Sequence, residues 1–217
     1  GYFGLRCLGD NHSILLKTPM RVVDCHVHLD FPQFDQDRQV LIELLAAEEL
    51  AVINIATDLA SIEAVDRLSR ENRLIWGAIG LHPSEITAST LIELPAELNR
   101  WRHLLNQNPK LVAIGEIGLD YHRLPEAGAT RRQQAVLEEL VIFALEVEKP
   151  IIFHCRGAYG DLATIISQHS GLSGVIHCFS GNWPEAERFL ELGLYLSLDG
   201  NLTYTKSEAI RDVAKRA

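Results

Sequence analysis

The chain has 217 residues, a formal net charge of −9 and a composition that is 47% hydrophobic, enough for one large domain with its own core. The acidic balance argues against a broad nucleic-acid-binding surface, because such surfaces need clustered lysine and arginine. No apolar stretch reaches the roughly 20 residues that span a bilayer, and residues 1–19 do not resemble a secretory signal. We therefore expect a cytoplasmic protein with no membrane partner.

Short apolar runs alternate with helical periodicity along the chain. We expect buried strands from Val22 onward and at residues 50–56, 74–79, 111–116, 150–154, 174–177 and 194–198. Helices are expected at residues 38–49, 61–71, 91–106, 130–148, 162–169, 185–192 and 207–216. Pro95 must lie near the start of its helix or at a break in it. This rhythm is typical of βα units with parallel strand pairing.

The first strand ends in a pair of histidines, His26 and His28. Spacing two places both side chains on one face of a strand. Two imidazoles on one face can bind one divalent cation together. Asp24 lies on the same face and could orient one imidazole.

Three later strand ends repeat this chemistry with Glu116, His154 and His177. For His154 or His177 alone, a hydrogen-bonded core histidine would be the better explanation, and Glu116 alone could be a helix-cap or salt-bridge carboxylate. Four histidines and a carboxylate at four strand ends favour a joint metal site. Glu116 has two oxygens and could bridge two cations, one held by His26 and His28 and the other by His154 and His177.

The cysteines show no paired spacing of the CxxC kind. Cys25, Cys155 and Cys178 adjoin the candidate metal histidines, and Cys7 lies near the start of the chain. Strand neighbours point to opposite faces, so we expect these three to pack as small apolar residues under helices. Reduced thiols and a cytosolic setting follow from this usage.

A doubly wound sheet and a (β/α)₈ barrel both fit the alternation. Polar residues of metal-binding type at several strand ends favour the barrel, whose strand ends converge on one mouth. A doubly wound sheet would place its site at one switch point, usually with a glycine fingerprint that this chain lacks. We expect residues 21–217 to form a TIM-barrel-like domain without the eighth βα unit, and residues 1–20 to be an extension outside the fold.

The motifs resemble those of the TatD family of metal-dependent hydrolases, and the closing Gly200-Asn201-Leu202-Thr203-Tyr204 is similar to its YjjV-like branch. The matching stretches follow family order over residues 21–217: Asp24-Cys25-His26-Val27-His28-Leu29, Gly80-Leu81-His82-Pro83, Gly115-Glu116-Ile117-Gly118-Leu119-Asp120-Tyr121, His154-Cys155-Arg156 and His177-Cys178-Phe179-Ser180-Gly181. The resemblance implies a distorted TIM barrel and a 3′→5′ deoxyribonuclease or related phosphodiesterase. It would use metal-activated water, two divalent ions (Mg²⁺, Zn²⁺, Mn²⁺ or similar), and DNA ends or short oligonucleotides as substrate.

The resemblance also implies roles for individual residues. Glu116 and His82 would be catalytic, and the substrate would contact His82, Arg156, Tyr121 and Arg123. From sequence alone His82 could equally structure its loop, and Arg156 could be a surface arginine rather than a phosphate ligand. The family's last metal-binding aspartate lies in a Glu-Thr-Asp motif, and this chain stops before it.

Two other functions are compatible with the same residues. A two-metal site also serves amide or ester hydrolysis, for example in a D-aminoacyl-tRNA deacylase. A metal-binding fragment without turnover is the other alternative. We expect the chain to be a monomer.

Overall fold

A computed structural model describes residues 22–122 and 128–217. The expected extension at residues 1–20 and the candidate substrate residue Arg123 lie outside the described residues.

The described residues form one parallel sheet of seven strands in the order β1-β2-β3-β4-β5-β6-β7. Every neighbouring pair is parallel, so each connection crosses over and all carboxyl ends of the strands meet at the same edge of the sheet. The strands are Val22–Val27, Leu50–Ile55, Ile75–Ile79, Leu111–Asp120, Ile151–Arg156, Gly174–Ile176 and Tyr195–Leu196. This curled, partial barrel confirms the predicted fold class.

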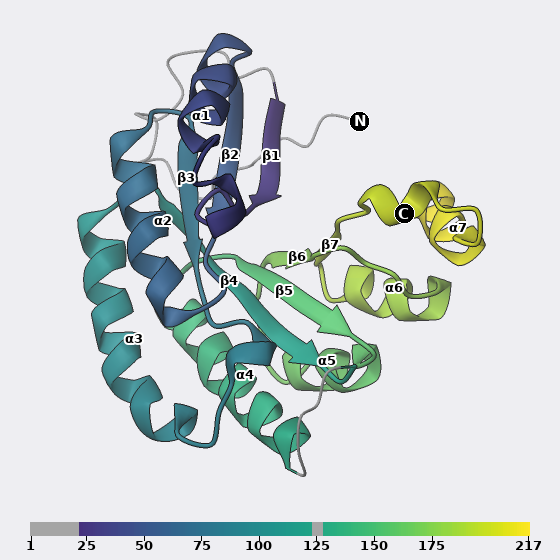
Figure 1. The fold of residues 1–217 in the computed structure, drawn as a ribbon. Helices are drawn as coiled ribbons and strands as arrows, with labels where there is room; N and C mark the ends of the chain where they lie inside the picture. Colours follow the sequence, from purple (N-terminus) through teal and green to yellow (C-terminus); the bar gives the residue numbers. More distant parts are fainter. Residues whose placement is uncertain (1–21, 123–127) are drawn as a thin grey trace.

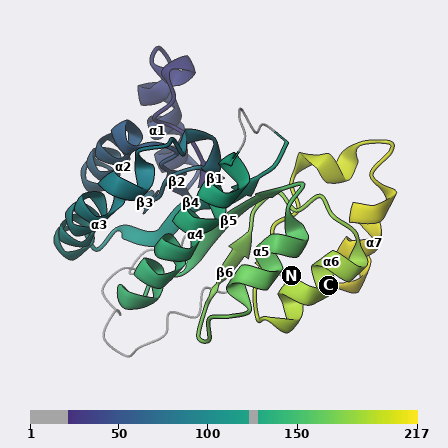
Figure 2. The same cartoon turned by 90° about the horizontal axis from the view of Figure 1, so that it is seen from below.

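Helices follow the strands in the predicted rhythm, and Figures 1 and 2 show them succeeding one another in an arc around the curved sheet. The α-helices α1 to α7 are Arg38–Ala47, Leu59–Glu71, Thr90–Gln107, Ala129–Glu146, Tyr159–Ile166, Trp183–Glu191 and Glu208–Arg216. Short 3₁₀ turns occur at Pro32–Phe34, Pro83–Glu85 and Gly200–Thr203. Among the described helices, none is long and apolar enough to cross a lipid bilayer.

Two apolar layers show how β5 is oriented. Ile151, Phe153 and Cys155 belong to the large core between the sheet and the helices. Ile152 instead packs with Ile55, Ala78 and Ala113 in a separate cluster on the opposite face of the sheet. Strand alternation therefore sends His154 and Arg156 to the face of Ile152. That face lines the inside of the curved sheet. His154 and Arg156 lie on it at the carboxyl end of β5.

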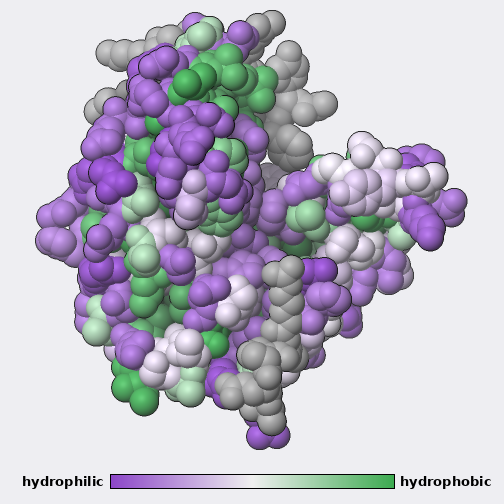
Figure 3. Space-filling model, in the orientation of Figure 1, coloured by the Kyte–Doolittle hydropathy of each residue, from purple (hydrophilic) through white to green (hydrophobic). Residues whose placement is uncertain are grey.

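Helix α1 differs from the prediction that its apolar residues face the core together. It contains no buried residue, and Val40 and Leu44 are 64% and 53% exposed. Leu41, Ile42 and Leu45 pack against the small cluster under β1 and β2. Figure 3 shows apolar residues gathering at the top of the molecule, where Figure 1 places α1. The helix covers an edge of the sheet and is therefore buried less than α2 to α5.

Candidate metal centre

The predicted metal residues line one pocket at the carboxyl ends of the strands. The pocket has a volume of about 700 Å³ and is lined by His26, His28, Phe31, Thr57, His82, Ser84, Glu85, Glu116, His154, Cys155, Arg156, His177, Cys178, Ser180 and Asp199. All five sequence-predicted metal residues are in this set. The structure therefore brings together side chains that lie on, or directly after, four different strands.

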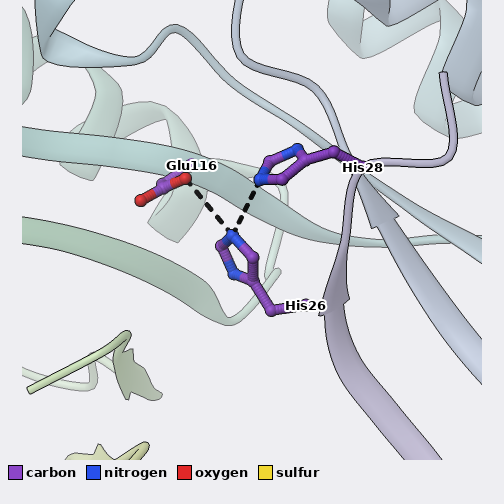
Figure 4. Close-up of side chains that lie close together, drawn as sticks. All are labelled: His26, His28 and Glu116. Atoms are coloured by element: carbon purple, nitrogen blue, oxygen red, sulfur yellow. Dashed lines mark hydrogen bonds and ion pairs between the residues drawn. The ribbon is translucent and has the colours of Figure 1, made fainter. Parts of the chain in front are cut away.

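His26, His28 and Glu116 form one group of possible metal donors, shown in Figure 4. The Nε2 atom of His26 lies 3.1 Å from Nε2 of His28 and 3.4 Å from Oε2 of Glu116. Nitrogen and carboxylate donors that converge in this way are the ligand types that bind a divalent cation. The donor set therefore fits a metal ion.

Hydrogen bonding fixes which nitrogen His28 presents to the pocket. Nδ1 of His28 lies 2.9 Å from the carbonyl oxygen of Ile55, which can only accept, so Nδ1 carries the proton of the neutral ring. Nε2 of His28 is then left with its lone pair facing the pocket. Nδ1 of His26 is buried without a hydrogen-bond partner. Asp24 does not orient the imidazole as expected, because its carboxylate accepts from the backbone N–H of His26 at 3.0 Å.

The second oxygen of Glu116 faces a different histidine. Oε1 lies 2.8 Å from Nδ1 of His154, whose Nε2 is 3.3 Å from Oδ2 of Asp120. The ring of His82 packs edge-on against His154 with centroids 4.2 Å apart. Glu116 is thus shared between two groups of donors, one with His26 and His28 and one with His82 and His154.

His177 lies with other neighbours than the sequence suggested. Its ring stacks on His26 at 3.4 Å between centroids and 6° between planes, and Nε2 lies 3.6 Å from Oδ2 of Asp199. His177, Cys178 and Asp199 form a third group of possible donors. The structure therefore groups His154 with His82, and His177 with Asp199.

Burial and neighbouring charges set the protonation of these groups. Burial alone would raise the pKa of Glu116, but hydrogen bonds from His154 and His26 outweigh it and hold that pKa well below its usual value. Burial, followed by repulsion from a neighbouring histidine, lowers the pKa of His28 and takes the pKa values of His82 and His177 to about 4. An ionised carboxylate and uncharged imidazoles are the forms that bind a metal.

The predicted substrate residues are placed differently from one another. Arg156 ends β5, is exposed and lines the pocket. His82 also lines the pocket, and its Nδ1 accepts a hydrogen bond from the backbone N–H of Ser84 at 3.1 Å. Tyr121 is not among the lining residues, and its hydroxyl donates to Asp161 at 2.8 Å. These substrate assignments stay predictions.

The expectation for the cysteines is correct at one position and wrong at two. Cys155 is buried in the core, as alternation predicted, but Cys25 is exposed and Cys178 lines the pocket. Cys25 lies on β1, which forms an edge of the sheet. Cys178 comes after the last residue of β6 and has a φ of 47°, so strand alternation does not govern its direction.

Several lining residues were not singled out from the sequence. Phe31 stacks on His28 with centroids 4.5 Å apart and 12° between planes. Ser84 and Glu85 come from the turn after β3, and Ser180 from the loop after β6. The only sequence signal that these positions share is a place in the loop shortly after a strand, and it is a weak one.

Asn54 secures the backbone just after His28. It is fully buried, its Oδ1 accepts from the N–H of Leu29 at 2.5 Å, and its Nδ2 donates to Asp30 at 2.9 Å. Replacing Asn54 by alanine is expected to lower the free energy of unfolding by about 1–3 kcal/mol, because a buried N–H loses its acceptor. Urea unfolding measures the loss. Asn99→Ala, at an exposed position of α3, should change stability by less than about 0.5 kcal/mol; equal effects of both changes would contradict this role of Asn54.

Comparison with known proteins gives consistent matches. Residues 23–217 match the family model described as TatD related DNase. The metal-dependent hydrolase YjjV of Escherichia coli K12 is 32% identical over 196 residues, which cover 89% of this chain and 73% of the relative. The 3′-5′ ssDNA/RNA exonuclease TatD of a Rahnella strain is 32% identical over 178 residues, covering 80% and 65%. The crystal structure of Escherichia coli YjjV superposes with a TM-score of 0.77 at 31% identity, over 91% of this chain and 75% of that one.

Proposed function

Because this chain belongs to the TatD-related DNase family and is a metal-dependent hydrolase, we propose that it removes nucleotides from the 3′ ends of single-stranded DNA or short oligonucleotides. The observation that carries the proposal is the position of Glu116, whose two oxygens face two separate histidine groups. A carboxylate shared in this way can bridge two divalent cations, and two such cations together can catalyse phosphodiester hydrolysis. The nuclease activity named for the Rahnella relative supports the choice of substrate.

We assign the cations to two adjoining sets of ligands. His26, His28 and Glu116 would hold one divalent ion, and Glu116 with His154 would hold the second. When bound, such ions supply Lewis acidity, which stabilises negative charge on phosphoryl oxygens and lowers the pKa of water. His177, the expected fifth ligand, stacks on His26 and faces Asp199, and it stays a predicted ligand of the second ion.

Three side chains support these ligands or meet the substrate. Asp120 faces Nε2 of His154 at 3.3 Å and thereby limits rotation of that ring. His82 accepts the Ser84 N–H through Nδ1, so the proton of the neutral ring lies on Nε2, where it can be donated to a substrate oxygen. Arg156 reaches the same pocket with a planar guanidinium, which suits a phosphate.

Replacing Arg156 by glutamine is expected to raise KM for a short oligonucleotide about tenfold, because a charge-assisted contact to phosphate is worth about 1.5–3 kcal/mol. The change should lower kcat much less, because Arg156 touches none of the assigned metal ligands. Steady-state kinetics at two salt concentrations measure both constants. Arg102→Gln serves as the control, since Arg102 pairs with Glu146 on the helical side; an unchanged KM in Arg156→Gln would contradict the phosphate role.

The net charge of the chain suits an enzyme that removes nucleotides from the end of a nucleic-acid strand. A net charge of −9 disfavours binding along a long duplex, because each phosphate contact relies on basic side chains. A pocket of about 700 Å³ has room for one terminal nucleotide rather than for a helix. We therefore propose that the chain binds the free ends of nucleic-acid strands as its substrate.

The test is the incubation of the metal-loaded chain with 5′-labelled single-stranded DNA. Stepwise shortening from the 3′ end, with a circular strand left intact, is the expected result. No shortening with Mg²⁺, Mn²⁺, Zn²⁺ or Co²⁺ would overturn the proposal. Hydrolysis of an aminoacyl ester instead would favour the deacylase alternative, and metal binding without any turnover would favour the binding alternative. The monomeric state and the cytoplasmic location stay predictions, which gel filtration and cell fractionation can check.

A further inference from the structure

We propose that the ring of Phe31 is a stacking platform for the nucleobase of the 3′-terminal nucleotide, an assignment that rests on the proposed nuclease function. Phe31 follows β1 and lines the pocket of the candidate metal centre. Its ring stacks on the imidazole of His28 with centroids 4.5 Å apart and 12° between planes. A base in contact with Phe31 would therefore lie beside the group of donors assigned to the first ion.

Packing in the core does not account for this ring. Phe31 neither belongs to nor packs against the three apolar clusters described above. The residue is partly exposed, whereas Phe143, Phe153 and Phe179 are fully buried. His28 covers one face of the Phe31 ring, and the exposed part of the residue borders the pocket. An aromatic surface of this kind gains most from a flat ligand that removes it from water.

A single arginine of α1 fixes the loop that carries Phe31. Nε of Arg38 donates to the carbonyl oxygen of Leu29 at 2.6 Å. Nη2 of the same side chain donates to the carbonyl oxygens of Asp30 and Phe31 at 3.2 and 3.1 Å. The carbonyl oxygen of Phe31 also accepts from the N–H of Phe34 at 3.0 Å. Because the loop is already ordered, binding a base should cost little conformational freedom.

The two sides of the pocket suit different parts of the substrate. Phe31 follows β1 and Arg156 ends β5, so they lie on opposite sides of Glu116 in the order of the strands. The part of the substrate that continues into solvent carries a phosphate at each nucleotide, which suits the guanidinium of Arg156. The 3′-terminal nucleotide has no phosphate beyond the bond to be hydrolysed, so its base and sugar remain for recognition. Stacking on an aromatic ring can hold any base, because every base has a π face.

Base stacking is measured with two oligonucleotides that differ only at the 3′ end. One ends in an ordinary nucleotide and the other in an abasic residue, and the last linkage of both is a phosphorothioate that resists hydrolysis. Fluorescence anisotropy of a 5′ dye gives the Kd of each for the chain loaded with Mn²⁺. The wild-type chain should bind the intact end at least about fivefold more tightly. This ratio should be the same at low and high salt, because salt screens charges and stacking involves none.

Variants at Phe31 test whether its ring is responsible for this preference. Phe31→Leu should reduce the ratio of the two Kd values to less than about twofold, because leucine keeps an apolar contact with His28 but offers no flat ring. Phe31→Trp should keep the wild-type ratio or raise it. Phe34→Ala is the matched control and should keep the ratio, since Phe34 lies in the same 3₁₀ turn but is not among the residues that line the pocket. Circular dichroism checks that each variant is folded.

Three results would overturn the inference: equal Kd values of the wild-type chain for the two ends, no binding of either oligonucleotide, and a wild-type ratio in Phe31→Leu. The nuclease proposal fails separately from the stacking site. A chain that prefers the intact end but shortens no DNA would retain the stacking site and lose only the nuclease activity. A chain that shortens DNA but binds both ends equally would remain a nuclease without this platform.

Discussion

Replacing Glu116 by glutamine is expected to deplete both cations of the centre and to lower oligonucleotide hydrolysis by at least about a hundredfold. The residue is 4% exposed, and its two oxygens face His26 and His154. Glutamine keeps the size of the side chain but removes the negative charge that both groups of donors share. Elemental analysis after dialysis, together with initial rates on single-stranded DNA, measures the two effects.

The matched control is Glu85→Gln, because Glu85 lines the same pocket without belonging to any of the three groups of possible metal donors. That variant should keep its metal. His26→Ala should deplete mainly the ion assigned to His26 and His28, while leaving the ion at His154. Full retention of metal by Glu116→Gln would show that the bridging assignment is wrong.

Gly118→Ala is expected to lower the free energy of unfolding by about 3 kcal/mol or more, because no relaxation of a side chain can relieve the clash. A Cβ at Gly118 would lie 1.9 Å from the backbone oxygen of His154, and the φ of Gly118 is 152°. Relief would require β4 and β5 to separate. Since these strands carry Glu116 and His154, the affinity for the cations should fall together with the free energy of unfolding.

Gly160→Ala is the matched control for this change. A Cβ there meets nothing within 4 Å, and the residue lies inside α5. Alanine should leave stability unchanged or raise it by up to about 1 kcal/mol, because it favours helix. Urea unfolding of both variants beside the wild-type chain measures the difference. A Gly118→Ala protein with the wild-type midpoint would contradict the close approach of β4 to β5.

The order of strands and helices could be predicted because each element has its own apolar period. The predicted boundaries of helices and strands were less accurate where a helix cap or an irregular strand pairing sets the boundary. α2 begins at Leu59 rather than Ser61, because Asp58 and Ser61 form a capping box. β4 continues to Asp120 rather than ending at Glu116, with an irregular register between Gly115 and Ile117. A break of register adds residues to a strand without a signal in hydrophobic periodicity.

The sequence predicted that the five residues of metal-binding type share one pocket, but not which of them face each other there. Parallel strand ends meet at one edge, and that rule brought His26, Glu116, His154 and His177 together. Which of them face each other depends on the curvature of the sheet and on the side-chain rotamers. The spacing of residues in the sequence carries no information on either. Asp199 illustrates the limit, since its approach to His177 arises from the loops that follow two neighbouring strands.

The stacked rings of His26 and His177 join strands that share no hydrogen bonds, since β1 pairs with β2 and β6 lies between β5 and β7. These residues meet only when the sheet has curled, so cation binding at either ring is linked thermodynamically to the curvature of the whole sheet. By mass action, a free cation at a hundred times its Kd should stabilise the folded chain by about 2.7 kcal/mol. A chelator should therefore lower the melting temperature of the entire domain, and the size of the shift should depend on cation concentration.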